Sequence, residues 1–167
     1  MKRLILAAGV AMALGAPGLA RAETACAELK ATRLPHAEVT AVTLETLGEA
    51  QACKLSVTSR PTADSDIRIE VWIPVGQAWN GKFVQLGNGG FAGQIPSGFL
   101  KRMAAQGYAA AGTDNGHQTP VGTSAVWALG HPEKLVDYGW RALKETTEAA
   151  KALIAAQKAG GPTRSYF

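Results

Sequence analysis

The sequence predicts an α/β fold in which antiparallel strands come first and strand-helix alternation follows. Two observations predict it. Early segments alternate polar with apolar, largely β-branched residues, and later apolar segments are separated by stretches of helical periodicity. We therefore expect one modest domain whose later strands are joined by a right-handed crossover.

The first predicted strands form a hairpin. Residues 53–59 and 67–74 have the alternation of half-buried strands. The segment between them, residues 59–66, contains the Pro, Asp and Ser that favour a turn. A third strand, residues 82–87, follows turn residues 79–81. An antiparallel arrangement is the natural result for the first two strands.

Helices and strands alternate in the second half of the sequence. Residues 97–106 fit a short helix, and residues 108–116 are small and mostly apolar, as in a buried parallel strand. Pro132 suits the first position of a long helix, residues 132–158. Its apolar face is expected to hold Val136, Trp140, Leu143, Thr147, Ala150 and Ile154.

The N-terminus has the layout of a secretory signal peptide. Lys2 and Arg3 precede an apolar run, and Ala20-Arg21-Ala22 is a small-x-small cleavage site. A membrane anchor is the alternative, since the run is just long enough to cross a bilayer, but it contains glycine and proline. We expect residues 1–22 to be removed, leaving a secreted or periplasmic domain of residues 23–167.

The mature chain is nearly neutral. Without residues 1–22, 14 basic side chains stand against 13 acidic ones. No basic surface therefore predicts a nucleic-acid partner. No later stretch is apolar enough to predict a membrane span, so no membrane partner is expected after signal cleavage.

Two cysteines remain in the mature chain, Cys26 and Cys53. In an oxidising compartment they predict one disulfide, which closes a loop of about 27 residues. Two separate buried thiols are the alternative. Their spacing fits neither a metal site nor a CxxC redox pair.

A glycine-rich loop follows the third predicted strand, with four glycines within seven residues: Gly87, Gly89, Gly90 and Gly93. A Walker phosphate loop would need Gly-Lys-Ser/Thr at its end, which is absent. The spacing matches a dinucleotide fingerprint that ends at Ala92, with Asp114 about twenty residues on. Pro96 and the exported location disfavour that interpretation.

The third interpretation is the loop after the third strand of an α/β-hydrolase. There a glycine-rich segment supplies one oxyanion-hole N–H, and the residue after the nucleophile supplies another. A tight turn with close packing is the alternative. No GxSxG motif occurs, and Ser97, Ser124 and Ser165 do not stand at a strand-to-helix elbow. We expect a fold truncated before its nucleophile elbow, because a new strand only begins at Tyr166.

Asp114, His117 and His131 are the remaining candidates for chemistry. Asp114 and His117 lie three residues apart at a predicted strand end. They could hold a metal or act in acid-base catalysis. Hydrogen-bonded loop and capping residues are the alternative for all three.

Four segments resemble the N-terminal blocks of the tannase and feruloyl esterase family, which also includes the hydrolase of mono(hydroxyethyl) terephthalate. They are residues 60–74, 79–93, 107–117 and 127–143. The resemblance spans residues 53–167 in the expected order. It implies a secreted or periplasmic serine esterase of α/β-hydrolase fold that cleaves esters of aromatic acids, such as gallate or ferulate, through an acyl-enzyme.

In the family, the strand that corresponds to residues 165–167 leads into a Gly-Cys-Ser-x-Gly-Gly elbow. A lid domain follows, often with a structural calcium, and the Asp and His of the triad come later. None of these is present in this sequence. The resemblance thus implies an inactive N-terminal fragment with no cofactor of its own, whose full-length parent takes small aromatic esters. A small exported binding protein that keeps half of the fold is the alternative.

The resemblance transfers few site residues. Asn88, Gly89, Gly90 and Phe91 correspond to the oxyanion-side wall of the family's active site. The segments 114–117 and 127–133 also match family motifs, and they make Asp114, His117 and His131 candidates for structural support of the site.

Overall fold

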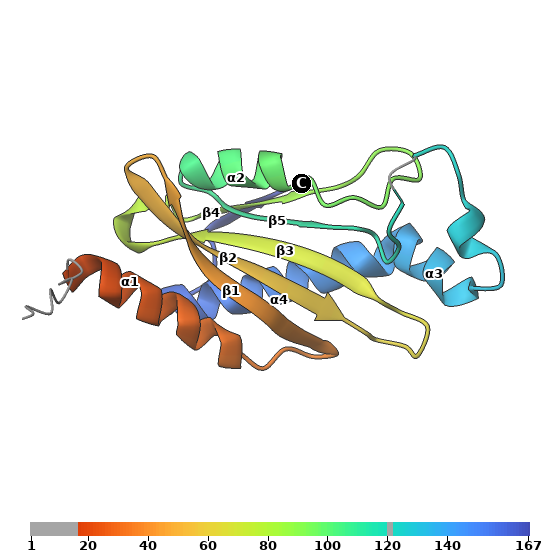
Figure 1. Ribbon diagram of the computed structural model, residues 1–167, viewed down its shortest axis with the longest axis horizontal. Helices are drawn as coiled ribbons and strands as arrows, with labels where there is room; N and C mark the ends of the chain where they lie inside the picture. Colours follow the sequence, from red (N-terminus) through yellow and green to blue (C-terminus); the bar gives the residue numbers. More distant parts are fainter. Residues whose placement is uncertain (1–16, 120–121) are drawn as a thin grey trace, which may run out of the picture.

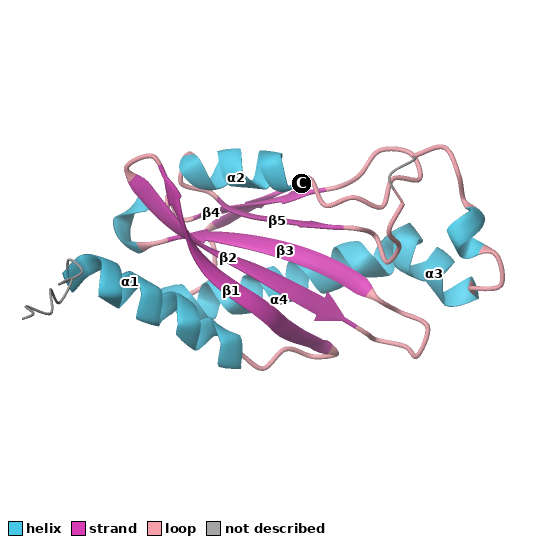
Figure 2. Cartoon of the chain, in the orientation of Figure 1, coloured by secondary structure: helices cyan, strands magenta, loops and turns pink. Residues whose placement is uncertain are grey.

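A six-stranded mixed sheet forms the centre of the molecule, with strand order β1-β2-β3-β5-β4-β6. Figure 1 shows the computed structural model, in which residues 17–119 and 122–167 are described. Residues 1–16 of the predicted signal peptide lie outside the described residues. Helix α2 covers one face of the sheet, and α1 and α4 lie against the other face (Figures 1 and 2).

Three antiparallel strands form one side of the sheet: β1 (Ala37–Leu47), β2 (Ala50–Ser59) and β3 (Ile67–Pro74). The predicted hairpin of the second and third strands is confirmed. The strand β1 is absent from the sequence prediction. Its residues are mostly exposed or half-buried, and only Val39 is buried, so its hydrophobic alternation is weak.

Parallel strands form the other side. Strand β4 (Lys82–Leu86) leads through α2 (Ser97–Ala105) to β5 (Ala109–Thr113), which pairs parallel with β4 and antiparallel with β3. On its other edge β4 pairs in parallel with β6 (Arg164–Tyr166). The expected order of antiparallel strands followed by strand-helix alternation is confirmed.

Small residues in β5 let both faces of the sheet be covered closely. All five of its residues are buried. A Cβ atom on Gly112 would lie 3.2 Å from Pro96 Cδ and 3.5 Å from a methyl of Leu100. The run Ala109-Ala110-Ala111-Gly112 thus allows α2 and the segment before it to approach the central strand.

The predicted long helix has the expected ends but not the expected regularity. Its parts are α3 (Pro132–Val136), a π-helical turn (Asp137–Arg141) and α4 (Ala142–Lys158). Trp140, expected on the apolar face, is 54% exposed. That expectation is wrong, because the π-helical turn shifts the residues before α4 around the helix axis relative to those within it.

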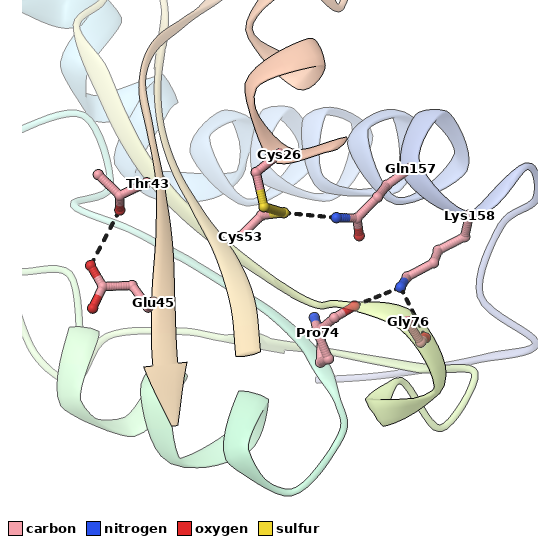
Figure 3. The surroundings of a disulfide bond; sticks show 8 residues. All are labelled: Cys26, Thr43, Glu45, Cys53, Pro74, Gly76, Gln157 and Lys158. Atoms are coloured by element: carbon pink, nitrogen blue, oxygen red, sulfur yellow. Dashed lines mark hydrogen bonds between the residues drawn. A yellow bond between two sulfur atoms is a disulfide. The ribbon is translucent and has the colours of Figure 1, made fainter. Parts of the chain in front are cut away.

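A disulfide joins Cys26 to Cys53, with a Cα–Cα distance of 5.4 Å, as predicted. It ties α1 (Pro17–Glu28) to β2, and Gln157 Nε2 at the end of α4 donates to Cys53 Sγ over 2.7 Å (Figure 3). Helix α1 buries only a narrow stripe of side chains. A helix of this length is marginal alone, so the disulfide is its main tether.

Removal of the disulfide is expected to lower the free energy of unfolding by about 3 kcal/mol, as for a loop of this length. The double variant Cys26→Ala/Cys53→Ala should show the loss in urea unfolding followed by circular dichroism. Each single variant should lose as much as the double variant, because either one breaks the bond. Equal stabilities of the double variant and the oxidised chain would contradict the prediction.

Helix α4 ends at Ala159, which has a left-handed backbone with φ of 54°. Glycine adopts this conformation without the Cβ penalty. We expect Ala159→Gly to raise the free energy of unfolding by about 1 kcal/mol. The matched control is Ala156→Gly, at an exposed position within α4, which should lower it by about as much. Destabilisation by both variants would refute this.

Candidate active site

The loop after β4 and the turn after β5 lie at the same edge of the sheet, because the two strands run in parallel. This carboxyl edge is where open α/β sheets bind their ligands. The structure therefore brings together the glycine-rich loop, residues 87–93, and the turn at residues 114–117. A pyrophosphate-binding helix would begin at the last glycine position, whereas α2 begins only at Ser97.

Half of the glycine-rich loop is anchored by backbone contacts. The N–H of Phe91 donates to Gly122 O over 2.8 Å, and that of Gly93 donates to Thr119 O over 3.2 Å. Gly90 has a φ of 56°, and a Cβ atom there would lie 2.7 Å from Gly122 O. At Gly93 a Cβ atom would lie 2.2 Å from His117 O. These two glycines are required by close packing of backbone on backbone.

The preceding amides are different. Among the described residues, no acceptor pairs with the backbone N–H of Asn88, Gly89 or Gly90. A Cβ atom on Gly89 would meet nothing within 4 Å. The loop thus presents N–H donors that no described residue accepts, next to a segment whose donors are occupied. Such an arrangement can polarise a carbonyl group or hold an anion.

Two side chains hold the carbonyl groups of the anchored segment. The hydroxyl of Tyr138 donates to Gly90 O over 2.7 Å, and His117 Nε2 lies 2.9 Å from Phe91 O. The His117 ring is buried and stacks on Trp127, with ring centroids 3.9 Å apart. His117 therefore supports the loop through a hydrogen bond that engages its Nε2 atom.

Asp114 stabilises the turn after β5. Its Oδ1 accepts the N–H of Arg68 over 3.0 Å and that of Gly116 over 2.9 Å. Its side chain is buried, and Oδ2 has no partner in the described part of the chain. Burial raises the pKa of Asp114 to about 6, although the two backbone hydrogen bonds act in the opposite direction.

The structure does not bring His131 to the loop. It lies immediately before α3, and its Nδ1 is 2.8 Å from Asp64 Oδ1 in the turn between β2 and β3. The ring is about half exposed. His131 therefore links the hairpin to α3 and is separate from the contacts that hold residues 87–93.

Sequence reasoning missed three features of this edge. Asn88 Nδ2 donates a hydrogen bond to Thr113 O over 2.8 Å, and Asn115 adopts a left-handed φ of 58°. Tyr138, in the π-helical turn, donates a hydrogen bond to the loop. A pocket of about 210 Å³ is lined by Gly87, Asn88, Asn115, Tyr138, Gly139, Leu143 and Phe167. Asn before Gly116 was a turn signal, but no signal in the sequence marked Tyr138.

Another pocket, of about 410 Å³, lies away from this edge, between α1 and the end of α4. Arg21 and Ala22 line part of it, and both precede the predicted cleavage point. Within the described ranges, no group of three His, Cys, Asp or Glu side chains is placed to hold a metal ion. No helix described in the structure has both the length and the apolar character to cross a membrane.

The pKa of Asp114 predicts a pH dependence of stability. The folded state binds its proton more tightly than the unfolded state, so the stability of the chain should fall as pH rises from about 4 to about 6. The substitution Asp114→Asn would keep the accepting oxygen and remove the charge. We expect this variant to be more stable than the native chain at pH 8, by up to about 3 kcal/mol, with no advantage at pH 4.

Urea unfolding at several pH values measures this, with Asp66→Asn as the control of opposite sign. Burial opposes the shift at Asp66, but its hydrogen bonds with Arg68 lower the pKa of that carboxyl overall. The control should therefore lose stability at pH 8. A loss of stability in Asp114→Asn that is the same at every pH would contradict the prediction.

Comparisons with known proteins bear on this geometry. A family model described as tannase and feruloyl esterase matches residues 53–167. The chain is 38% identical over 160 residues to an uncharacterized esterase of Xanthomonas campestris, covering 89% of this chain and 27% of that protein. It is 30% identical over 134 residues to probable feruloyl esterase B-2 of Aspergillus flavus, covering 80% and 25%. It spans about a quarter of the length of these curated relatives.

Solved structures show the same fold. The chain superposes on feruloyl esterase B from Aspergillus oryzae with a TM-score of 0.77 and 25% identity, covering 86% of this chain and 31% of that one. With the tannin acyl hydrolase from Aspergillus niger the TM-score is 0.64 at 19% identity, covering 85% and 31%. The expected α/β fold is confirmed, and the chain covers part of it. Because the family model matches more than half of the chain, the protein belongs to the tannase and feruloyl esterase family.

Proposed function

We propose that this chain supplies the oxyanion-binding side of the active site of a secreted serine carboxylic-ester hydrolase. Its substrates would be esters of aromatic or phenolic acids. One observation supports this most strongly: the backbone N–H groups of Asn88, Gly89 and Gly90, which no described residue accepts, lie at the carboxyl edge of parallel strands. The relatives named feruloyl esterase support the ester class.

The chemistry follows from the charge that develops during ester cleavage. Attack on the carbonyl carbon puts a negative charge on its oxygen, and N–H donors held about 2.7–3.1 Å away stabilise it. Phe91, which was predicted to belong to the oxyanion-side wall, already donates its N–H to Gly122 O. The proposed donors are therefore the amides of Asn88, Gly89 and Gly90, and Phe91 contributes its ring and its anchored carbonyl.

The remaining catalytic groups are proposed to come from polypeptide that the relatives have and this chain lacks. The sequence contains no GxSxG motif. Ser97 Oγ donates to Glu70, and Ser59 Oγ donates to Glu145, so both hydroxyls serve structural hydrogen bonds. His117 Nε2 is engaged with Phe91 O. We infer that the chain by itself does not carry out acyl transfer.

Export is part of the proposal. Residues 1–22 would direct the chain out of the cytoplasm and be removed after Ala22. The disulfide between Cys26 and Cys53 supports an oxidising compartment, where such bonds form and persist. Cys26 lies close behind the proposed cleavage point, so the disulfide would hold the new N-terminus against β2.

Ester turnover tests the proposed division of the active site. The purified chain is expected to release no product from an activated aryl ester of ferulic acid above the buffer rate. A longer polypeptide, encoded by the same reading frame through a Gly-Cys-Ser-x-Gly-Gly elbow and the later triad residues, should hydrolyse it. A stoichiometric burst of product from the purified chain would contradict the proposal.

The donor role of Gly89 has a matched test in that longer polypeptide. Gly89→Pro removes the N–H, whereas Gly89→Ala keeps it and adds a methyl group to open space. We expect the proline variant to lose about 10²–10³-fold in kcat, the usual cost of an oxyanion donor, and the alanine variant to lose little. Equal rates for the two variants would exclude the Gly89 amide as a donor.

A further inference from the structure

The π-helical turn at Asp137–Arg141 is an energetically costly element beside the glycine-rich loop. Such turns are rare and occur frequently at functional sites. The carboxylate of Asp137 is fully buried, with Oδ1 2.9 Å from Arg141 Nη1. Its Oδ2 has no partner among the described residues. A buried carboxylate oxygen without a hydrogen bond costs free energy, so the turn is not explained by helix stability alone.

Packing fixes the position of this turn against the loop region. A Cβ atom on Gly116 would lie 2.8 Å from Asp137 Cβ, so the turn after β5 contacts the π-helical turn directly. Arg141 Nη1 also donates to Glu133 Oε2 over 2.8 Å, which ties the turn to α3. The residue next to Asp137 is Tyr138, whose hydroxyl donates to Gly90 O over 2.7 Å.

That hydrogen bond completes the anchoring of one peptide group. The carbonyl of Gly90 and the N–H of Phe91 belong to the same planar unit. Tyr138 holds its oxygen, and Gly122 O accepts its N–H. With this plane fixed at both ends, the left-handed φ of Gly90 determines where the preceding amide points. The preceding plane, which contains Gly89 O and the Gly90 N–H, is held as well, because the N–H of Ala92 donates to Gly89 O over 3.2 Å. The direction of the Gly90 N–H therefore depends on both planes, and Tyr138 is the side chain that holds the second.

We propose that Tyr138 is a positioning residue for the free amides of Gly89 and Gly90. The π-helical turn delivers its hydroxyl to Gly90 O, and the hydroxyl orients the donors through this hydrogen bond. The catalytic meaning of this inference rests on the proposed function, but the positioning itself is measurable without an ester. The ring also contacts Phe91 and Trp127, with centroids 5.7 and 5.3 Å away, so the hydroxyl must be separated from the ring.

Tyr138→Phe makes that separation, because it removes one oxygen and keeps the ring. Backbone ¹⁵N relaxation on the labelled 167-residue chain is expected to show Gly89 and Gly90 order parameters falling from about 0.85 to below about 0.6. Exchange of the Phe91 amide should become faster by on the order of tenfold as its anchored plane loosens. The buried Gly112 in β5 is the internal reference and should not change.

The matched control is Tyr108→Phe, since the Tyr108 hydroxyl has no hydrogen bond within the described ranges. It should leave Gly89, Gly90 and Phe91 as they are in the native chain. Unchanged order parameters and amide shifts at Gly89 and Gly90 in Tyr138→Phe would overturn the proposal. So would a matching loss at Gly112, which would indicate a general effect on stability.

A second measurement uses the native chain and needs no variant. A cross-relaxation peak between the ring protons of Tyr138 and the amide proton of residue 90 or 91 is expected, and its absence would also overturn the proposal. The outcome is independent of the oxyanion role. If Gly89→Pro and Gly89→Ala had equal rates while Tyr138→Phe loosened the loop, the proposed function would fail and the positioning role would stand.

Discussion

The parallel pairing of β4 with β5 is the constraint on which the rest of the site depends. Parallel strands end at the same edge, so the loop after β4 and the turn after β5 begin side by side. The close approach of Pro96 and Leu100 to Gly112 in turn needs the small side chains of β5. A larger residue in that strand would move α2 and the loop before it, and with them the amides of Asn88, Gly89 and Gly90.

The glycine-rich loop combines the two interpretations that its sequence left open. Gly90 and Gly93 are tight-packing glycines, since a Cβ atom at either would overlap the carbonyl oxygen of Gly122 or His117. Gly89 is different, because a Cβ atom there would meet no described atom within 4 Å and the neighbouring N–H groups have no acceptor among the described residues. Close packing of the second half fixes the backbone that leads out of the first half, so structural packing and the proposed donors share one loop.

Local patterns predicted the β2–β3 hairpin, the disulfide, the buried strand β5 and the ends of the long helix. They failed where the signal was weak or non-local. Strand β1 buries only Val39, so its hydrophobic alternation is weak. At Trp140 the spacing of apolar residues is that of a regular helix, but the π-helical turn changes which side chains face the core. His131 and Tyr138 show the same limit at the site. Spacing along the chain does not reveal that one contacts Asp64 and the other Gly90.

The buried side-chain atoms that lack a hydrogen-bond partner support the location of the site independently of the related proteins. Six buried side-chain atoms lack a hydrogen-bond partner within residues 17–119 and 122–167, and only Gln157 Oε1 lies near the disulfide. The other five belong to the carboxyl edge: Asp114, Asn115, His117, Trp127 and Asp137. Left-handed Asn115 and the π-helical turn are there too. Apart from Gln157, the unpaired buried side-chain atoms of the described residues therefore gather at the edge where the amides of Asn88, Gly89 and Gly90 meet a pocket. This is the pattern expected when local stability is given up for a preorganised site.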